Sequence, residues 1–187
     1  MIMIKSLCAL TMAALLAQAG KANPDLKYDE RAGLSVQKFP KNDEWDFKEM
    51  GQFAKNPKFV VSHKVDELWI EIIHIPPATT GSFDNKKQAE ADYAGWAGIK
   101  GVSEVKQVSF QASKLPGGGG NGANAWFYQA SMKVAEKPVE MREWVFIGKE
   151  NQCQYIVMMH GDEGMYKKHQ KVADFILGNI RTYKIPK

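Results

Sequence analysis

The sequence predicts an α+β fold in which an antiparallel β-sheet is flanked by helices. Segments that alternate apolar and polar residues, the pattern of half-buried strands, outnumber segments of helical spacing. Short turn-like stretches join these strands in succession, and short connections favour antiparallel pairing. Two segments of helical spacing, over about 85–98 and 163–179, have an apolar face that needs a sheet to cover it.

The composition is that of an ordinary globular domain. Of the 187 residues, 44% are hydrophobic and 25% are charged, so a packed core is expected and global disorder is not. The formal net charge is +4, and Lys and Glu residues are interspersed along the chain. A balance this close to neutral does not indicate binding to nucleic acid or to an anionic membrane surface.

Residues 1–22 have the pattern of a secretory signal peptide. Lys5 supplies the positive charge of its n-region, and an apolar stretch follows over 7–17. Small residues then recur at the two positions that signal peptidase recognises, in 17–19 and again in 20–22. The apolar stretch is shorter than the roughly 20 residues that span a membrane. We therefore expect cleavage, a mature chain without a membrane span, and a periplasmic or secreted protein.

The rest of the chain is interpreted as one domain. Residues 23–32 are polar and contain a proline, which predicts a linker, and residues 33–187 then form a single α+β domain. Cys8 leaves with the leader, so Cys153 is the one cysteine of the mature chain and no internal disulfide is possible. Cys153 is expected to be a small buried hydrophobe.

The first half of the domain predicts strands and then a helix. Short strands are expected over about 34–39 and 45–50, with a connection over 51–57. Alternation over 58–75 predicts a hairpin that turns at Asp66 and Glu67. Asp84 or Ser82 is the expected N-cap of the helix over 85–98.

The second half predicts four more strands and a closing helix. The strands are expected over about 105–112, 125–134, 139–147 and 152–160. Asp162 is the expected N-cap of the helix over 163–179, and His169 belongs to its apolar face.

Several segments of the chain resemble the PsbP-like family, the family of the extrinsic photosystem II subunit and many exported bacterial proteins. The segments are GLSVQKFP at 33–40 with Trp45 soon after, the hairpin that ends at Ile75 and Pro76, and the closing strands and helix from REWVFI at 142–147 to FILGNI at 175–180. Where Asn179 and Ile180 stand, the family usually has a serine and an aromatic residue. The resemblance implies an αβα sandwich and an accessory or binding role without catalysis. No metal-binding residues of the family can be matched, so its photosynthetic role is not carried over.

The best candidate for a metal site in the sequence is His160, Asp162, Glu163 and His169, which would make the protein a metal-dependent hydrolase. Zinc needs three or four converging ligands. The alternative is structural, because Asp162 would cap the closing helix, Glu163 would favour its positive end and His169 would pack in the core. We favour the structural reading and expect no cofactor and no metal. His63 and His74 lie on opposite arms of the hairpin and are not expected to be neighbours.

The glycine-rich segment 116–121 is interpreted as a flexible hairpin tip. It lacks the Lys-Ser/Thr ending and the following helix of a phosphate-binding loop. The consecutive aromatics Trp126, Phe127 and Tyr128 must point to both faces of their strand, so at least one of them leaves the main core face. We therefore expect a partner to dock here. The predicted contact residues are Trp126, Phe127, Tyr128, Gly118 and Gly119, with Phe127 as the outward anchor unless a helix covers that face.

These observations favour a non-enzymatic exported accessory or binding protein whose partner is another exported protein or a small ligand. Two alternatives remain open: an inhibitor or immunity-type protein that blocks a partner enzyme, and the hydrolase centred on residues 160–169.

Overall fold

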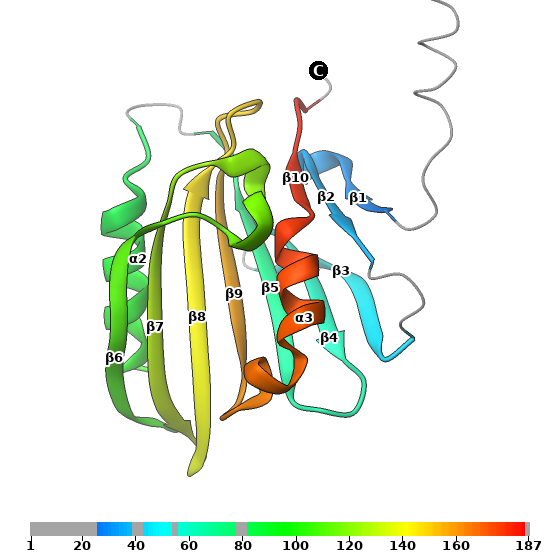
Figure 1. The fold of residues 1–187 in the computed structure, drawn as a ribbon. Helices are drawn as coiled ribbons and strands as arrows, with labels where there is room; N and C mark the ends of the chain where they lie inside the picture. The colour runs from blue at the N-terminus through cyan, green and yellow to red at the C-terminus, as the bar shows by residue number, and fades with distance from the viewer. Residues whose placement is uncertain (1–25, 39–42, 54–55, 78–81, 186–187) are drawn as a thin grey trace, which may run out of the picture.

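The structure, a computed structural model, describes residues 26–38, 43–53, 56–77 and 82–185, and in these residues seven strands form one antiparallel sheet (Figure 1). Alternating apolar side chains form these strands, as predicted, and every neighbouring pair is antiparallel. In spatial order the strands are β3 (Trp45–Phe53), β4 (Asn56–His63), β5 (Leu68–Ile75), β9 (Gln154–Asp162), β8 (Lys137–Ile147), β7 (Ala125–Val134) and β6 (Val102–Ser113).

A second, smaller sheet joins the two ends of the described chain. It pairs β1 (Leu26–Asp29) and β10 (Ile180–Thr182) with the two edges of β2 (Leu34–Gln37). Residues 26–32 were expected to belong to a linker. They instead form β1 and the 3-10 turn η1 (Glu30–Ala32), because β2 offers them an edge to pair with. The predicted signal peptide, 1–22, lies outside the described residues.

Helices cover both faces of the large sheet, as the sequence predicts. In Figure 1, α3 (Met165–Gly178) lies in front of the sheet and α2 (Asn85–Trp96) lies behind it, against β7 and β8. Asp84 caps α2 by accepting hydrogen bonds from the backbone N–H groups of Lys86 and Lys87, at 3.0 and 3.1 Å. The α+β prediction, with an antiparallel sheet between helices, is confirmed.

The predicted cap of the second helix is wrong. Asp162 is the last residue of β9 and pairs with Val139, so the strand runs two residues past the predicted end. The N-cap of α3 is Gly164, which has φ of 83° and no side chain that could accept a capping hydrogen bond. A glycine fits there because left-handed backbone is costly for other residues.

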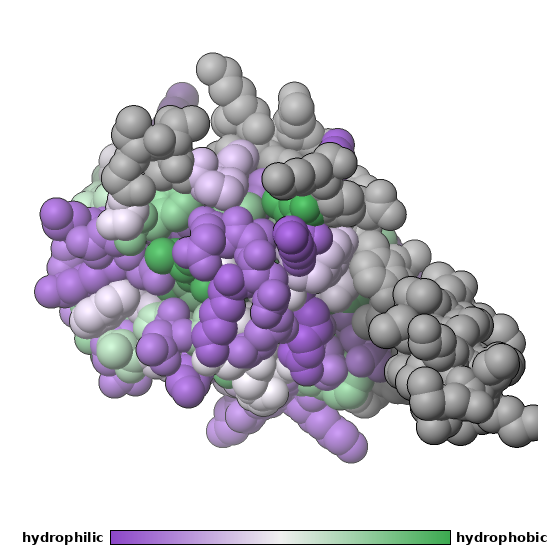
Figure 2. Space-filling model, turned by 90° about the horizontal axis from the view of Figure 1, so that it is seen from above, coloured by the Kyte–Doolittle hydropathy of each residue, from purple (hydrophilic) through white to green (hydrophobic). Residues whose placement is uncertain are grey.

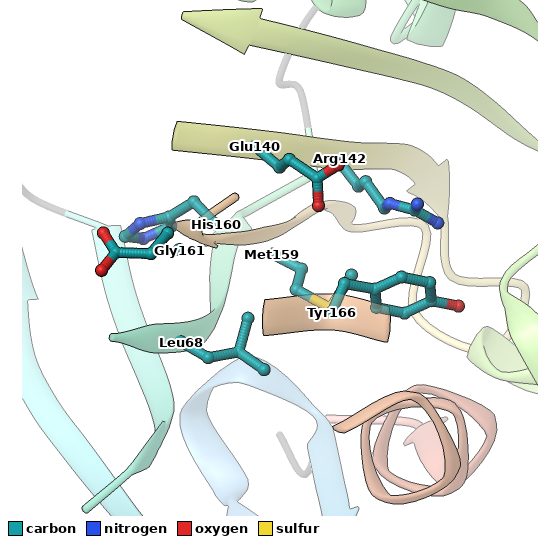
Figure 3. Close-up of a pocket in the computed structure, with 8 residues that line it drawn as sticks. Leu68, Glu140, Arg142, Met159, His160, Gly161 and Tyr166 are labelled. Carbon is teal, nitrogen blue, oxygen red and sulfur yellow. The ribbon is translucent and has the colours of Figure 1, made fainter. Parts of the chain in front are cut away.

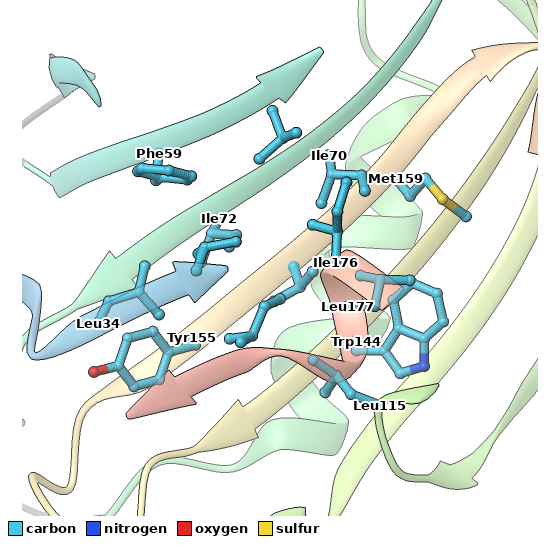
Figure 4. Packing of buried hydrophobic residues seen from close by; sticks show 14 of the residues in the cluster. Leu34, Phe59, Ile70, Ile72, Leu115, Trp144, Tyr155, Met159, Ile176 and Leu177 are labelled. Atoms are coloured by element: carbon cyan, nitrogen blue, oxygen red, sulfur yellow. The ribbon is translucent and has the colours of Figure 1, made fainter. Parts of the chain in front are cut away.

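The hydrophobic core is divided by the sheet. The larger part lies between the sheet and α3, where Figure 4 shows Ile176 and Leu177 of the helix close to Trp144, Met159 and Ile70 of the strands. The smaller part lies between the sheet and α2 and contains Ala89, Tyr128, Ala130, Met132, Met141, Val145 and Ile156. Successive residues of one strand therefore pack into different parts of the core, on opposite faces of the sheet.

Two connections differ from the prediction. β3 extends to Phe53 and β4 begins at Asn56, so most of the expected connection 51–57 is strand. Gly51 and Pro57 are tolerated because the pairing of β3 with β4 is irregular between Met50 and Phe53, and such irregularities accommodate glycine and proline. In the β4–β5 hairpin Val61 pairs with Ile70, which leaves residues 64–67, not only Asp66 and Glu67, in the turn.

The glycine-rich segment is packed and is not the flexible tip that was expected. It forms the 3-10 turns η2 (Pro116–Gly118) and η3 (Gly120–Gly122) against the end of α3. A Cβ atom on Gly119 would lie 2.0 Å from the carbonyl oxygen of Leu177. Asn121 further ties the segment to β10, through a hydrogen bond of 2.6 Å from its Nδ2 to the carbonyl oxygen of Thr182. The glycines thus serve close packing.

Hydrophilic side chains dominate the end of the molecule that Figure 2 shows, and hydrophobic ones gather there only in small spots. The exposed large apolar side chains of the described residues are scattered over the chain, at Val65, Ile99, Val108 and Val134. Among the described residues, no helix has the length and apolar character needed to cross a membrane.

Candidate functional site

The predicted aromatic contact residues are divided between the two faces of β7. Tyr128 is fully buried under α2, and Trp126 is half-buried on the same face, stacked on Phe110 with ring centroids 5.4 Å apart. Phe127 points to the other face and packs against Trp144 of the main core, at 5.0 Å. Phe127 is half-buried against this core, so it is not a free outward anchor. The three aromatics do not form one exposed surface.

The two predicted glycines differ in the same way. Gly118 is exposed, whereas Gly119 is buried against α3. Whether this segment binds a partner stays a prediction.

The candidate metal residues of the segment 160–169 are not brought together. His160 faces the α2 side of the sheet, where it stacks on Trp69 with centroids 5.4 Å apart and lies 3.6 Å from a carboxylate oxygen of Glu71. His169 lies on α3, on the opposite face, and contacts Asp66. Alternation along β9 causes the separation, since His160 and the buried Met159 point to opposite sides.

A small cavity does lie at this end of the sheet, as Figure 3 shows. Arg142 and Tyr166 are on one side of it and His160 points away from them. Its volume is about 10 Å³, which is room for a single water molecule. The guanidinium carbon of Arg142 lies 3.8 Å from the ring centre of Tyr166, so this contact closes most of the space.

One cluster of possible metal ligands was missed by sequence reasoning. Ligand atoms of His63, Asp66 and His169 lie within 4.8 Å of one another. Asp66 Oδ2 is 2.6 Å from His169 Nε2, 2.7 Å from Lys168 Nζ and 3.9 Å from His63 Nδ1. These four residues, here called the His63 corner, join the β4–β5 turn to α3. No short-range pattern marks them, because only the packing of the helix on the hairpin brings them together.

Most donor and acceptor atoms of the His63 corner are already occupied; the exception is His63 Nε2, which is buried without a hydrogen bond to the described residues and lies 3.6 Å from a carboxylate oxygen of Glu44. His63 Nδ1 accepts hydrogen bonds from the backbone N–H groups of Val65 and Asp66, at 3.3 and 2.9 Å. Hydrogen bonds from Lys168 and His169 lower the pKa of Asp66 to about 2. A metal ion would have to displace these hydrogens and the ammonium group. The arrangement therefore favours a structural role, in which these residues link the β4–β5 turn to α3, over a metal site.

A larger cavity lies beside α2, where the helix leaves β9 and β5 partly uncovered. Its volume is about 310 Å³, within the range of small-molecule sites. Most of its lining is apolar, and the rim includes Ile99, which is 47% exposed. We call it the Glu143 pocket; its lining residues are Ile73, Ala91, Asp92, Gly95, Trp96, Ile99, Glu143, Ile156 and Met158.

Glu143 is a buried carboxyl group on the wall of this pocket. Only 1% of the residue is exposed, because β8 turns residue 143 toward α2 while Trp144 faces α3. Tyr128 donates a hydrogen bond from its hydroxyl to Glu143 Oε2, at 3.0 Å, and in turn accepts one from Trp96 Nε1, at 2.8 Å. A chain of polar groups thus runs from the helix through the sheet to one oxygen of Glu143.

The other oxygen of Glu143 has no such donor. Neither Glu143 Oε1 nor Asp92 Oδ2 has a hydrogen-bond partner among the described residues, and both atoms are buried. Asp92 Oδ1 accepts from Gln88 Nε2 at 2.8 Å, which fixes the Asp92 carboxylate on α2. The pocket wall therefore contains two carboxyl oxygens that lack partners.

Burial, and then the negative charge of Asp92, raise the pKa of Glu143 well above its ordinary value of 4.5. A hydrogen bond between the two carboxyl groups adds to this effect, and it requires a proton on one of them. Both effects favour the protonated form of Glu143. Apart from that single proton, Glu143 Oε1 and Asp92 Oδ2 have no donor among the described residues.

Comparisons by sequence give no relative. No protein-family model matches the chain, and no curated protein matches it in sequence. Comparison of structures does find similar proteins. The solution structure of cyanobacterial PsbP (CyanoP) from Synechocystis sp. PCC 6803 superposes with a TM-score of 0.57 over 88% of this chain and 96% of that one, at 11% identity. The chain has a PsbP-like fold.

Two further structures agree with this assignment. LpqN, a protein involved in cell envelope biogenesis of Mycobacterium tuberculosis, gives a TM-score of 0.53 at 13% identity, over 81% of this chain and 85% of LpqN. A protein of Bacteroides thetaiotaomicron VPI-5482 gives 0.54 at 11% identity, over 87% of this chain and 50% of the other. At such identities the PsbP-like likeness establishes the fold, and function must be argued from the site.

Within this PsbP-like fold, the Glu143 pocket is the place where the described residues combine an apolar cavity with polar groups that lack partners. Cys153 offers no comparable site. It is fully buried in the main core, where burial raises the pKa of its thiol, so the expected structural role is confirmed.

Proposed function

We propose that this protein is a non-enzymatic, exported accessory protein that binds a small molecule with an apolar body in the Glu143 pocket. One observation carries the proposal: Glu143, a residue that is only 1% exposed, forms part of the wall of a largely apolar cavity of about 310 Å³. Burying such a group without full hydrogen bonding costs about 1–3 kcal/mol or more. A ligand that satisfies the group offsets this cost.

The lining of the pocket suits binding better than covalent chemistry. Its described residues include no serine, cysteine, lysine or histidine that could act as a nucleophile. The apolar side chains Ile73, Ile156 and Met158 offer an apolar ligand about the same environment as the protein core.

The exported location rests on the leader pattern of residues 1–22. The structural likeness to LpqN, itself involved in cell envelope biogenesis, agrees with a role in the periplasm or outside the cell. The accessory role agrees with the PsbP-like fold.

Titration with the neutral hydrophobic dye Nile red tests the proposal. Dye emission and the quenching of tryptophan fluorescence report binding, since Trp96 lines the pocket. Gly95→Leu is the decisive variant, because a Cβ atom at Gly95 meets nothing within 4 Å and the larger side chain would fill the cavity. Gly98→Leu is the matched control, as Gly98 is one turn further along, is exposed and does not line the pocket.

We expect saturable dye binding to the unaltered protein and to Gly98→Leu, and a loss of at least about tenfold in affinity in Gly95→Leu. Equal binding by all three proteins would contradict the proposal.

A further inference from the structure

The two carboxyl oxygens without partners restrict what the pocket accepts as the polar end of a ligand. Glu143 Oε1 and Asp92 Oδ2 are both acceptors when ionised, and both are buried at the pocket wall. The described lining contains no cationic side chain that could neutralise them. An anionic end group would meet the negative charge of Asp92, so it is disfavoured.

We propose that the ligand of the Glu143 pocket is an apolar primary amine, whose ammonium group binds Asp92 and Glu143 in place of the proton that they share. This inference rests on the proposed function and names the chemical class of its ligand.

An ammonium group fits the two carboxyl groups better than a neutral group or a metal ion does. It carries three N–H donors, so it can reach both oxygens at once, and hydrogen bonds between ions are about twice as strong as neutral ones. A hydroxyl group has one donor and would leave the proton of Glu143 in place. Calcium takes six to eight oxygen ligands, and the apolar walls of Ile73, Ile156 and Met158 supply none.

The neighbours of Glu143 on every packed element leave the position open for a cation. Asp92 faces it from α2 and Tyr128 from β7. On β9 its neighbour is Met158, which separates it from Glu71 of β5. Glu71 already has its own partners, Lys58 at 2.6 Å and His160 at 3.6 Å.

Binding of the amine releases one proton. Before binding, Glu143 is protonated and its O–H bond is directed to Asp92. The ammonium enters with its charge, forms N–H···O bonds with both carboxylates, and the carboxyl proton of Glu143 passes to solvent. The charge of the site thus goes from −1 to −2 as the ligand adds +1. Affinity therefore falls as the pH is lowered.

Calorimetric titration with three probes of equal length tests this inference: hexylammonium chloride, 1-hexanol and sodium hexanoate. Titrations of the amine at pH 7.5 in phosphate and in Tris buffer count the protons released, because the two buffers differ in ionisation enthalpy. Glu143→Gln preserves the shape of the side chain and removes its charge. Asp92→Asn does the same on the more exposed helix and is the second variant if the first folds poorly.

We expect hexylammonium to bind at least about tenfold more tightly than hexanol, with release of close to one proton, and hexanoate to bind most weakly. In Glu143→Gln or Asp92→Asn, the preference for the amine over hexanol should be lost.

Equal binding of hexanol and hexylammonium would overturn the inference and leave the proposed apolar site standing. Binding of none of the three probes, together with failure of Nile red to bind, would contradict both. Tight binding of the amine that persists in both variants would place it elsewhere on the molecule and overturn the inference.

Discussion

The Glu143 pocket and the His63 corner each bring ionisable side chains together in largely apolar surroundings. They differ in how far the polar atoms have hydrogen-bond partners within the protein. In the His63 corner, Asp66 is held by Lys168 and His169, and His63 Nδ1 receives two backbone N–H groups. In the Glu143 pocket, Glu143 Oε1 and Asp92 Oδ2 are buried and have no donor among the described residues other than the proton of the carboxyl pair itself. Asp66 Oδ2 and His63 Nδ1 therefore have protein partners without a ligand, although His63 Nε2 has no hydrogen bond within the described part of the chain, whereas the two oxygens of the pocket have no protein donor there beyond that proton.

Whether the polar atoms of a cluster have hydrogen-bond partners in the protein therefore says more about its role here than the types of its residues do. Histidines and an aspartate are the residues that suggest metal chemistry, yet here their hydrogen bonds link a hairpin to a helix. The glutamate and aspartate of the pocket match no motif. Burial of their oxygens without donors costs free energy, and a ligand that donates to them would offset this cost.

The largest effect that we expect concerns the response of stability to pH. The folded state raises the pKa of Glu143, so the folded protein holds a proton that the unfolded chain releases above about pH 4.5. The free energy of unfolding should therefore fall as the pH rises from there towards the pKa of the folded state, at up to about 1.4 kcal/mol per pH unit. Urea denaturation at several pH values, compared with Glu143→Gln, measures the contribution of this group.

In Glu143→Gln the amide can accept from Tyr128 and donate to Asp92, so its stability should lack this part of the pH dependence. Parallel pH profiles for the two proteins would mean that Glu143 does not hold its proton in the folded state.

A second prediction concerns the His63 corner. The ring of His169 packs 4.3 Å from that of His63 and 5.8 Å from that of Trp45, measured between ring centroids. His169→Ala should lower the free energy of unfolding by about 1–3 kcal/mol, the usual range for loss of such packing. Nile red binding to the folded variant should be unchanged. A stable variant with impaired dye binding would reverse the roles that we assign to the two regions.

Lys168→Ala should have a smaller effect than His169→Ala, because the Lys168 side chain is 55% exposed and exposed ion pairs contribute little. Denaturation of the two variants at pH 7 under the same conditions gives the order. If the lysine contributes more than the histidine, the ion pair dominates the corner and the ring packing does not.

The acid side of the pH profile should respond to the His63 corner. Lys168 and His169 lower the pKa of Asp66 from 3.8 to about 2, so the stabilisation is present above about pH 4 and is lost as the pH falls from there towards 2. Asp66→Asn should be less stable at neutral pH and should lose less of its stability below pH 4. Denaturation between pH 2 and pH 5 tests the sign, which is opposite to that of Glu143.

The smallest effect concerns zinc. Because the ligand atoms of the corner already carry protein hydrogen bonds, addition of zinc chloride should change the melting temperature little, and by the same amount in His169→Ala. Stoichiometric zinc that raises the melting temperature, and that disappears in His169→Ala, would make the corner a metal site.

The order of elements followed from the sequence because local patterns decide it. Alternation along β4 and β5 predicted the hairpin, and Asp84 was correctly identified as the cap of α2. The cap of α3 was missed because the length of β9 depends on its pairing with β8, which brings Asp162 opposite Val139. The packing of Gly117 and Gly119 was missed for a similar reason: their neighbour, the end of α3, is about 60 residues away in the sequence.

The site was not predictable in the same way. Glu143 follows an apolar strand pattern, in which one polar residue on an inner face gives no sign of what surrounds it. Its significance comes from Asp92, on a helix 50 residues earlier, and from the partly uncovered sheet beside that helix. The aromatic run at 126–128 was visible in the sequence, but which of its side chains would be covered depended on both helices.

The most direct test of the central claim, that the Glu143 pocket and not the His63 corner is the ligand site, is a ¹H–¹⁵N NMR titration of the protein with hexylammonium chloride. We predict that the backbone amide signals of Ala91, Gly95, Ile156 and Met158 shift with a single saturation curve, while those of Val65, Lys168 and His169 stay in place. Shifts that are confined to the corner, or spread evenly over the surface, would contradict the account.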